Sequence, residues 1–249
     1  MATDQIAQKG DVLCAVYMLC DTSESMDGEP IRELNSLLSE LVDKIQLEGK
    51  RGQDLRLGVI SFNSAPKVEL ELQKLTAEST IPELTAAGTT RLELAIDKLA
   101  EVVESDYGKI KTAGAKAARP VVFVITDGVP TDADGYPLQD HSVWEDALER
   151  LWNVGQVAVP RIYAFGFGNA DESVLRKLTS DRGVAVDAVK MATGADTANE
   201  IARIFPYLFR TIIAGADAVS NADGDVPDLG PALLSVFSPP SDSVDLSAW

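Results

Sequence analysis

The chain has 249 residues, 45% of them apolar, and a formal net charge of −17 at pH 7. This length allows one large domain or two small ones, and the apolar fraction is enough for a sizeable core. The acidic balance opposes binding to nucleic acid and docking on anionic membranes, because both present negative charge. No apolar run reaches the roughly 18 residues of a membrane span. Residues 1–11 lack the features of a secretory signal, so we expect a cytoplasmic protein.

The cysteines and the histidine limit the possible chemistry. Cys14 and Cys20 lie in the first apolar run. In an extended strand they would be about 20 Å apart, at roughly 3.3 Å per residue, which is too far for a disulfide. We therefore expect two buried, reduced thiols. The only histidine, His141, lies in a polar stretch without a nucleophile motif, which argues against a Ser-His-Asp or Cys-His active site.

Apolar runs alternate with helical patterns from the start of the chain. Residues 12–20 form a continuous apolar run that predicts a buried strand. Pro30 opens a segment with apolar residues at a 3.6-residue period, which predicts a long helix. The run 55–62 predicts a second strand. The alternating segment 65–72 predicts an antiparallel edge strand that a tight turn joins to it.

The same alternation continues in the middle of the chain. Residues 92–103 have helical periodicity, and 109–119 are expected to form a basic loop. The run 120–126 is apolar throughout, which predicts a central strand covered on both faces. Residues 143–151 predict a helix and 157–165 predict a further strand.

The last elements complete an α/β pattern. Residues 173–178 predict a short helix, 183–188 an edge strand, and 198–213 a final helix that Pro206 should kink or break near residue 205. We predict a doubly wound, mostly parallel six-stranded sheet with one antiparallel edge strand and helices on both faces. The predicted domain spans 11–214. Residues 215–249 hold six aspartates and no Lys or Arg, which predicts an acidic disordered tail or a docking segment.

Three polar segments follow predicted strands or precede a predicted helix. They are 21–25 (DTSES), 88–90 (GTT) and 127–128 (DG). In an open parallel sheet, ligands bind beyond the carboxyl ends of the strands. Carboxylate and hydroxyl oxygens without histidine or thiolate suit Mg²⁺ or Mn²⁺ and argue against Zn²⁺ or copper. Because few protein charges meet the ion, it would keep a position for water or a partner's carboxylate.

These segments resemble the metal-ion-dependent adhesion site of the von Willebrand factor A (VWA) domain. That site has the pattern D-x-S-x-S, then a loop threonine, then an aspartate after a central strand, and the resemblance covers about 11–213. It implies a Mg²⁺ ion, or Mn²⁺ or Ca²⁺, that binds an acidic residue of a protein partner. The implied metal ligands are Asp21, Ser23, Ser25, Thr90 and Asp127. Thr89 is an alternative to Thr90, which we prefer because Thr-x-Leu leading into the helix aligns better with the family's loop.

The surroundings of the implied ion form an expected partner-binding rim. Its residues are Glu24, Met26, Thr89 and Gly128. Glu24 stands where the family usually has glycine, which bears on partner preference more than on metal binding. The stretches VYMLCDTSESMDGEPIRELNSLL and VVFVITDGVPTD are similar to bacterial tellurite-resistance-type VWA proteins. That narrower similarity implies an intracellular role in stress response.

Two further functions remain open at this stage. One is a Mg²⁺-dependent phosphohydrolase or phosphotransferase with Asp21 as nucleophile. Such enzymes commonly need a second acidic residue two positions on and a nearby lysine, but Ser23 stands at the first place and no well-placed lysine follows. The other is a structural subunit with a vestigial metal site. The favoured function is a non-enzymatic, metal-dependent interaction module. A further hypothesis is that the acidic tail docks on the protein's own metal site.

Overall fold

The centre of the molecule is β1 (Val12–Asp21), a strand in which every residue is buried. Its side chains alternate between two apolar cores, with Val16 and Met18 in one and Tyr17 and Leu19 in the other. Both faces of the strand must therefore be covered by other elements. The computed structural model describes residues 6–48, 53–138, 142–154, 159–181, 184–185, 189–190 and 197–221.

Strand β1 lies in the interior of one sheet, whose strand order is β3-β2-β1-β5-β6-β9, and the short β4 pairs with the start of β1. The pairings are parallel, except that β2 and β3 are antiparallel. The strands are β2 (Leu55–Phe62), β3 (Pro66–Gln73), β4 (Lys116–Ala117), β5 (Val121–Thr126), β6 (Arg161–Gly166) and β9 (Val189–Lys190). The predicted sheet of six mostly parallel strands with one antiparallel edge strand is confirmed.

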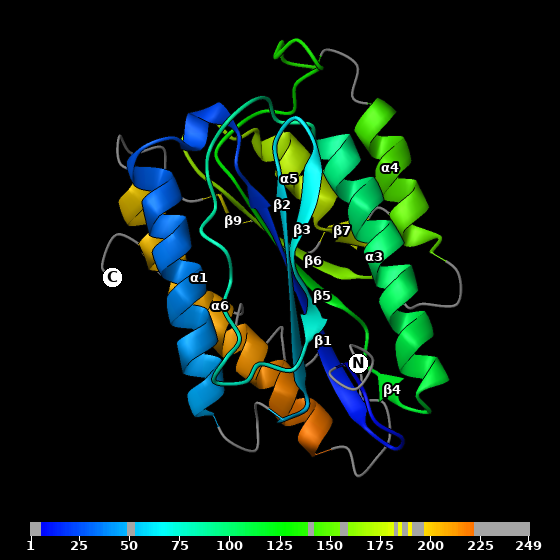
Figure 1. Cartoon of the computed structure of the whole chain (residues 1–249). Helices are drawn as coiled ribbons and strands as arrows, with labels where there is room; N and C mark the ends of the chain where they lie inside the picture. The colour runs from blue at the N-terminus through cyan, green and yellow to red at the C-terminus, as the bar shows by residue number, and fades with distance from the viewer. Residues whose placement is uncertain are drawn as a thin grey trace, which may run out of the picture.

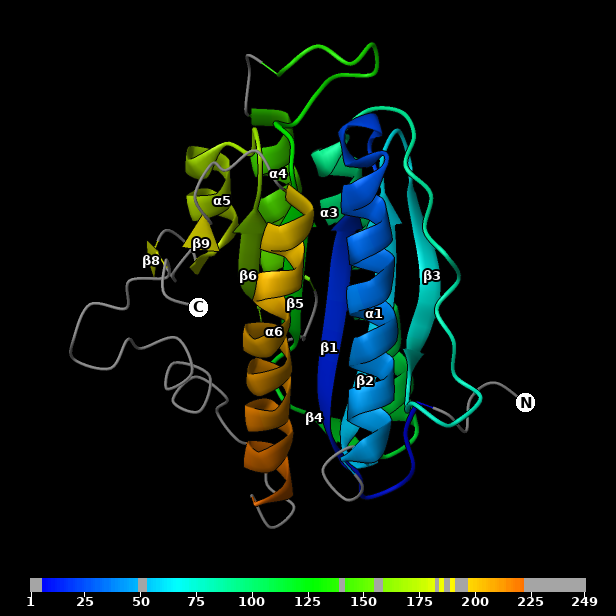
Figure 2. The same ribbon diagram turned by 90° about the vertical axis from the view of Figure 1, so that its left-hand side faces the viewer.

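Helices cover both faces of the sheet (Figures 1 and 2). On one face α1 (Glu29–Leu47) packs against α6 (Thr197–Ser220). On the other face α3 (Leu92–Thr112) packs against α4 (Ser142–Trp152), and α5 (Glu172–Leu178) shares their apolar core. The arrangement is the predicted doubly wound α/β fold. No helix in the described part of the chain is long and apolar enough to cross a membrane.

Two helices extend further than the sequence predicted. Helix α3 continues to Thr112, so the expected loop 109–119 begins as helix and then holds β4. Ile110 is buried on the same side of α3 as Val103, and this packing favours continued helix over the local basic composition. Helix α6 runs through Pro206 to Ser220 instead of breaking near residue 205. The predicted tail therefore begins inside a helix, and 222–249 lie outside the described residues.

The prediction of an edge strand of the main sheet at 183–188 is wrong. Within that range, β8 (Val184–Ala185) pairs with β7 (Ser180–Asp181) in a separate hairpin, and the edge of the main sheet is β9. Residues 183 and 186–188 lie outside the described part. Short apolar runs such as this one pair according to their neighbours in space, which local composition does not specify.

The two cysteines are as expected. Cys14 and Cys20 are both buried and free. Burial raises the pKa of the Cys14 thiol to about 12 and raises the pKa of the Cys20 thiol further. Neither side chain is therefore poised for nucleophilic chemistry or metal binding.

Candidate functional site

The loops after β1 and β5 meet because these strands are parallel neighbours, with Cys20 opposite Ile125. Asp21 ends β1, and Asp127 follows the last residue of β5. The chain then turns from β1 into the short 3₁₀ helix η2 (Glu24–Met26) and on into α1 at the same edge of the sheet (Figure 1). This edge is where the strand order reverses, the position at which open α/β sheets bind ligands.

Asp21 is held in one orientation at the bottom of the site. Its side chain is fully buried, at 0% exposed. Oδ1 accepts a hydrogen bond of 2.8 Å from the Ser23 backbone N–H, and Oδ2 accepts one of 2.6 Å from Thr126 Oγ1. Both bonds stabilise the ionised carboxylate and fix the direction of its remaining lone pairs.

A short chain of hydroxyl contacts connects the two acidic segments. Ser23 Oγ lies 3.1 Å from Ser25 Oγ, and Ser25 Oγ donates to Asp127 Oδ1 at 2.6 Å. Ser23 and Asp127 are buried, whereas Ser25 is exposed. The site is thus closed from below and open to solvent on the side of Ser25.

The GTT loop, residues 88–90, places the Thr90 side chain near Ser25, whereas the Thr89 side chain lies away from this cluster. A Cβ added at Gly128 would lie 3.3 Å from Thr90 Oγ1 and 3.7 Å from Ser25 Oγ. These two hydroxyls therefore border one small space above Gly128. Thr89 instead lies next to Ser64, with their hydroxyl oxygens 3.1 Å apart. This geometry favours Thr90 over the alternative Thr89.

Burial determines the electrostatics of the two carboxyl groups. It raises the pKa of Asp21 to about 6, against the lowering effect of hydrogen bonds from Ser23 and Thr126, and the charge of Asp127 adds to the rise. Burial also raises the pKa of Asp127, against the lowering effect of its bond from Ser25. Two desolvated carboxylates side by side form a site that a cation would stabilise.

The donor set fits a small hard cation. It consists of two carboxylates and three hydroxyls, with room above Gly128 that a side chain there would fill. The described residues contain no group of three or more His, Cys, Asp or Glu side chains that could hold a metal. The site offers oxygen ligands alone, as Mg²⁺ or Mn²⁺ prefers. His141 lies outside the described residues.

Three of the four residues expected at the rim are exposed or partly exposed at this edge of the sheet. Glu24 is exposed, and Thr89 and Gly128 are partly exposed at the same edge. Met26 is not on the rim, because its side chain is fully buried in the core under α1. The one-turn 3₁₀ helix rotates this apolar residue inward, and sequence spacing alone did not indicate that turn.

Two residues with roles at the site were missed from the sequence. Thr126 was assigned only to a strand, yet its hydroxyl orients Asp21. Thr131 was not among the expected site residues, yet its Oγ1 accepts from the Thr90 backbone N–H at 2.9 Å. The available signal was a polar residue at the end of an otherwise apolar strand, directly before Asp127.

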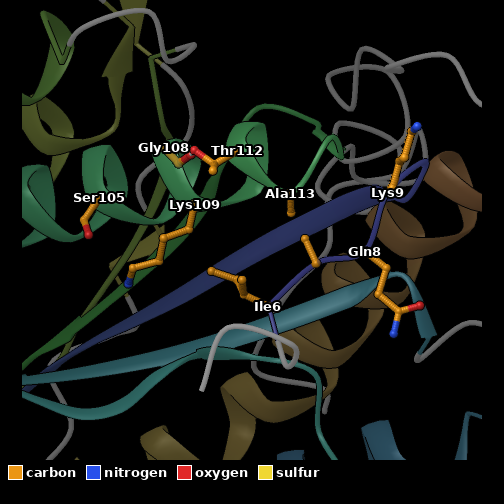
Figure 3. Close-up of a pocket in the computed structure, with 9 residues that line it drawn as sticks. Ile6, Gln8, Lys9, Ser105, Gly108, Lys109, Thr112 and Ala113 are labelled. Carbon is orange, nitrogen blue, oxygen red and sulfur yellow. The ribbon is translucent and has the colours of Figure 1, made fainter. Parts of the chain in front are cut away.

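A separate hollow lies at the opposite end of the sheet. It has a volume of about 860 Å³. Figure 3 shows Ile6, Gln8 and Lys9 on one side of it and Ser105, Lys109 and Thr112 of α3 on the other. Ile6 and Lys9 precede the start of β1, whereas Asp21 ends it, so the length of a ten-residue strand, about 30 Å, separates the hollow from the site. The hollow contributes nothing to the oxygen cluster.

Comparison with known proteins agrees with this fold. The family model of the von Willebrand factor type A domain matches residues 15–203. The chain belongs to this family, whose members are protein-interaction and adhesion modules. No curated protein sequence matches the chain.

Solved structures with the same fold come from several bacteria. The pilus adhesin SpaC of Lactobacillus rhamnosus GG has a TM-score of 0.59 at 17% identity, covering 84% of this chain and 31% of that chain. A von Willebrand factor type A protein of Catenulispora acidiphila has a TM-score of 0.54 at 13% identity, covering 82% and 49%. The vWF domain of the type V pili tip protein Mfa5 of Porphyromonas gingivalis has a TM-score of 0.51 at 14% identity, covering 81% and 96%. The chain spans less than half of the first two proteins, and identities this low establish the fold alone.

Proposed function

We propose that the protein is a non-enzymatic interaction module that binds a partner's carboxylate through a Mg²⁺ ion. The observation that supports this most directly is the convergence of oxygen-bearing side chains from three loops. The proposed ligands are Asp21, Ser23, Ser25, Thr90 and Asp127. Ser25 is exposed while Asp21 is fully buried, so an ion in this cluster has protein oxygens beneath it and solvent above it.

The proposed ion would remain electrophilic because only two of its protein ligands carry charge. The five proposed protein ligands leave one position of an octahedral shell, which a partner's aspartate or glutamate would fill. Mg²⁺ gives up water reluctantly and keeps some of its water molecules in most protein sites, and a partner's carboxylate would replace one of these. Mn²⁺ would bind the same ligands, and Ca²⁺ would need a wider and more flexible site.

The geometry weighs against the alternative of phosphoryl transfer by Asp21. This carboxylate is fully buried and already accepts two hydrogen bonds, from Ser23 N–H and Thr126 Oγ1. An attacking oxygen needs an open approach and a free lone pair directed at the substrate. We therefore propose that the protein lacks this activity.

The cellular setting is also part of the proposal. The similarity of its two longest motifs to tellurite-resistance-type VWA proteins favours a cytoplasmic protein of a bacterial stress response. Docking of the acidic segment 222–249 on the metal site stays a hypothesis outside the described residues.

Calorimetric titration of the metal-free chain with MgCl₂ tests the proposal. We expect one site per chain, lost in Asp127→Asn but retained in Asp43→Asn, an exposed carboxylate on α1. Equal heats for all three proteins would contradict magnesium binding at this cluster. Binding of magnesium without any gain in affinity for a carboxylate-bearing protein would leave a vestigial, structural metal site.

A further inference from the structure

A turn at residues 131–138 is joined directly to the proposed metal ligand Thr90. The Thr90 backbone N–H donates to Thr131 Oγ1 at 2.9 Å, and the Thr131 N–H donates to the Thr90 carbonyl oxygen at 2.9 Å. These reciprocal bonds fix the start of the turn to the loop that carries Thr90. A contact made by the turn is therefore made next to the proposed ion.

The turn is well ordered by its own hydrogen bonds. Asp132 Oδ1 accepts from the backbone N–H groups of Asp134 and Tyr136, at 2.9 Å each, and the Asp132 N–H donates to the Tyr136 carbonyl at 2.9 Å. A Cβ added at Gly135, where φ is +87°, would lie 3.4 Å from Thr89 Cγ2. The tip of the turn thus lies against the predicted rim residue Thr89.

Tyr136 projects from this ordered turn into solvent. Its side chain is 70% exposed, and among the described residues only Leu47, at 82%, is a more exposed large apolar residue. An aromatic ring held on a rigid turn loses little conformational entropy on binding and buries a large area, which is why tyrosine is frequent at the centres of interfaces. A side chain this exposed contributes little to folding, so Tyr136 is well placed to contact a second molecule.

The charges near the site restrict which carboxylate can approach. Glu24 and Asp134 are exposed carboxylates on the two loops that flank Thr89 and Thr90, in a chain of net charge −17. The nearby cation Arg91 is already paired with Glu93 at 2.5 Å. An acidic partner residue surrounded by further acids would be repelled, whereas one flanked by basic residues would be attracted and correctly oriented.

We infer that the 131–138 turn is a second recognition element of the same site. It fits a protein segment whose metal-binding Asp or Glu lies within a few residues of an apolar side chain, which packs on Tyr136, and of a Lys or Arg, which pairs with Asp134 or Glu24. This inference rests on the proposed function and adds the composition of the partner segment to it.

A random peptide library displayed on phage provides the probe. The full chain is immobilised, the library is bound in MgCl₂, and bound phage are eluted with EDTA. We expect the eluted sequences to share one Asp or Glu with an apolar residue and a Lys or Arg close by. Peptides from this pool should bind Tyr136→Ser about tenfold more weakly, and Leu47→Ser, the matched control at the far end of α1, with unchanged affinity.

The charge contact has its own control. Asp134→Asn should weaken the same peptides about threefold at low salt and have no effect at high salt, while Asp43→Asn should be neutral under both conditions. Thermal unfolding curves that match those of the unchanged chain will show that the variants are folded.

The outcomes separate the two proposals. EDTA-eluted acidic peptides without flanking preference, bound equally well by Tyr136→Ser, would overturn the role of the turn and leave the metal-dependent function intact. If EDTA elutes no more phage than buffer with MgCl₂ does, the proposed function is overturned and this inference with it.

Discussion

Ser25 and Asp127 are 102 positions apart in the chain, yet Ser25 Oγ donates a hydrogen bond of 2.6 Å to Asp127 Oδ1. Only the parallel pairing of β1 with β5 brings these two loops together. Ser25 is also the exposed member of the cluster. Its hydroxyl therefore lies between the buried carboxylates and whatever approaches from solvent.

Replacement of Ser25 by alanine should weaken magnesium binding with little effect on folding. Loss of the hydroxyl removes one proposed ligand and the bond that orients Asp127, for which we expect about a tenfold loss of affinity or more. Because the residue is exposed, the free energy of unfolding should fall by about 1 kcal/mol or less. Calorimetry with MgCl₂ measures the first effect and urea unfolding the second. Ser25→Thr, which keeps a hydroxyl, should bind magnesium; equal affinity of Ser25→Ala and the unchanged chain would exclude Ser25 as a ligand.

Thr126 should act as a positioning residue for Asp21. In Thr126→Val the bond to Asp21 Oδ2 is lost while the shape of the buried side chain is kept. We expect about a tenfold loss of magnesium affinity and a free energy of unfolding lower by about 1–2 kcal/mol. Thr126→Ser should restore magnesium affinity because it restores the donor. If Thr126→Ser fails to do so, the threonine acts through packing rather than through its hydroxyl.

The raised pKa of Asp21 predicts how pH acts on the metal-free protein. Its folded pKa of about 6 lies above the ordinary value of 3.8, so the folded state binds this proton more tightly than the unfolded state does. The protonated group therefore contributes stability that is complete below pH 3.8 and is lost as the pH rises to about 6. At 1.36 kcal/mol for each pKa unit, the loss is about 3 kcal/mol.

Asp21→Asn isolates this effect, because the amide does not titrate. In EDTA the variant should become more stable than the unchanged chain as the pH rises through that window, and saturating MgCl₂ should reverse the order. Urea unfolding at several pH values provides the measurement. Parallel pH profiles for the two proteins would show that Asp21 does not carry the shift.

Gly88 should be required for the position of Thr90. Its φ is +75°, a conformation that residues with a side chain rarely adopt, and an added Cβ would overlap Ser64 Oγ. Gly88→Ala should lower the free energy of unfolding by about 1–3 kcal/mol and weaken magnesium binding, as measured by urea unfolding and calorimetry. Adding Ser64→Ala should relieve the overlap but not the backbone strain, so we expect partial recovery. Full recovery would mean that the backbone conformation carries no cost.

The sequence was sufficient for the layers of the fold, and the side chains proposed from it as metal ligands lie together at one edge of the sheet. Continuous apolar runs and 3.6-residue periods extend over whole elements, and they located β1, β2 and β5 to within one residue of their ends and the start of α1 to within one residue. Element ends were less certain where packing outweighs local composition. The burial of Ile110 extends α3 into a basic stretch, and α6 continues past Pro206.

The residues that hold the proposed ligands in position could not be predicted in the same way. Thr126 and Thr131 act through hydrogen bonds to residues 105 and 41 positions away, and spacing along one chain carries no trace of such pairs. Met26 was assigned to the rim because it follows Ser25, but the 3₁₀ turn buries it. Contacts across loops depend on the register of the strands beneath them, which only the structure supplies.

Residues near both ends of the described chain form hydrogen bonds at the start of the same strand. The Ile6 carbonyl oxygen accepts from Arg56 Nε, and Ser220 Oγ donates to Asp54 Oδ2 at 2.7 Å, both at the start of β2. Ile6 and Asn221 therefore both lie at the end of the sheet remote from Asp21. A tether joined at either of these two residues would start about one strand length, roughly 30 Å, from the oxygen-rich edge.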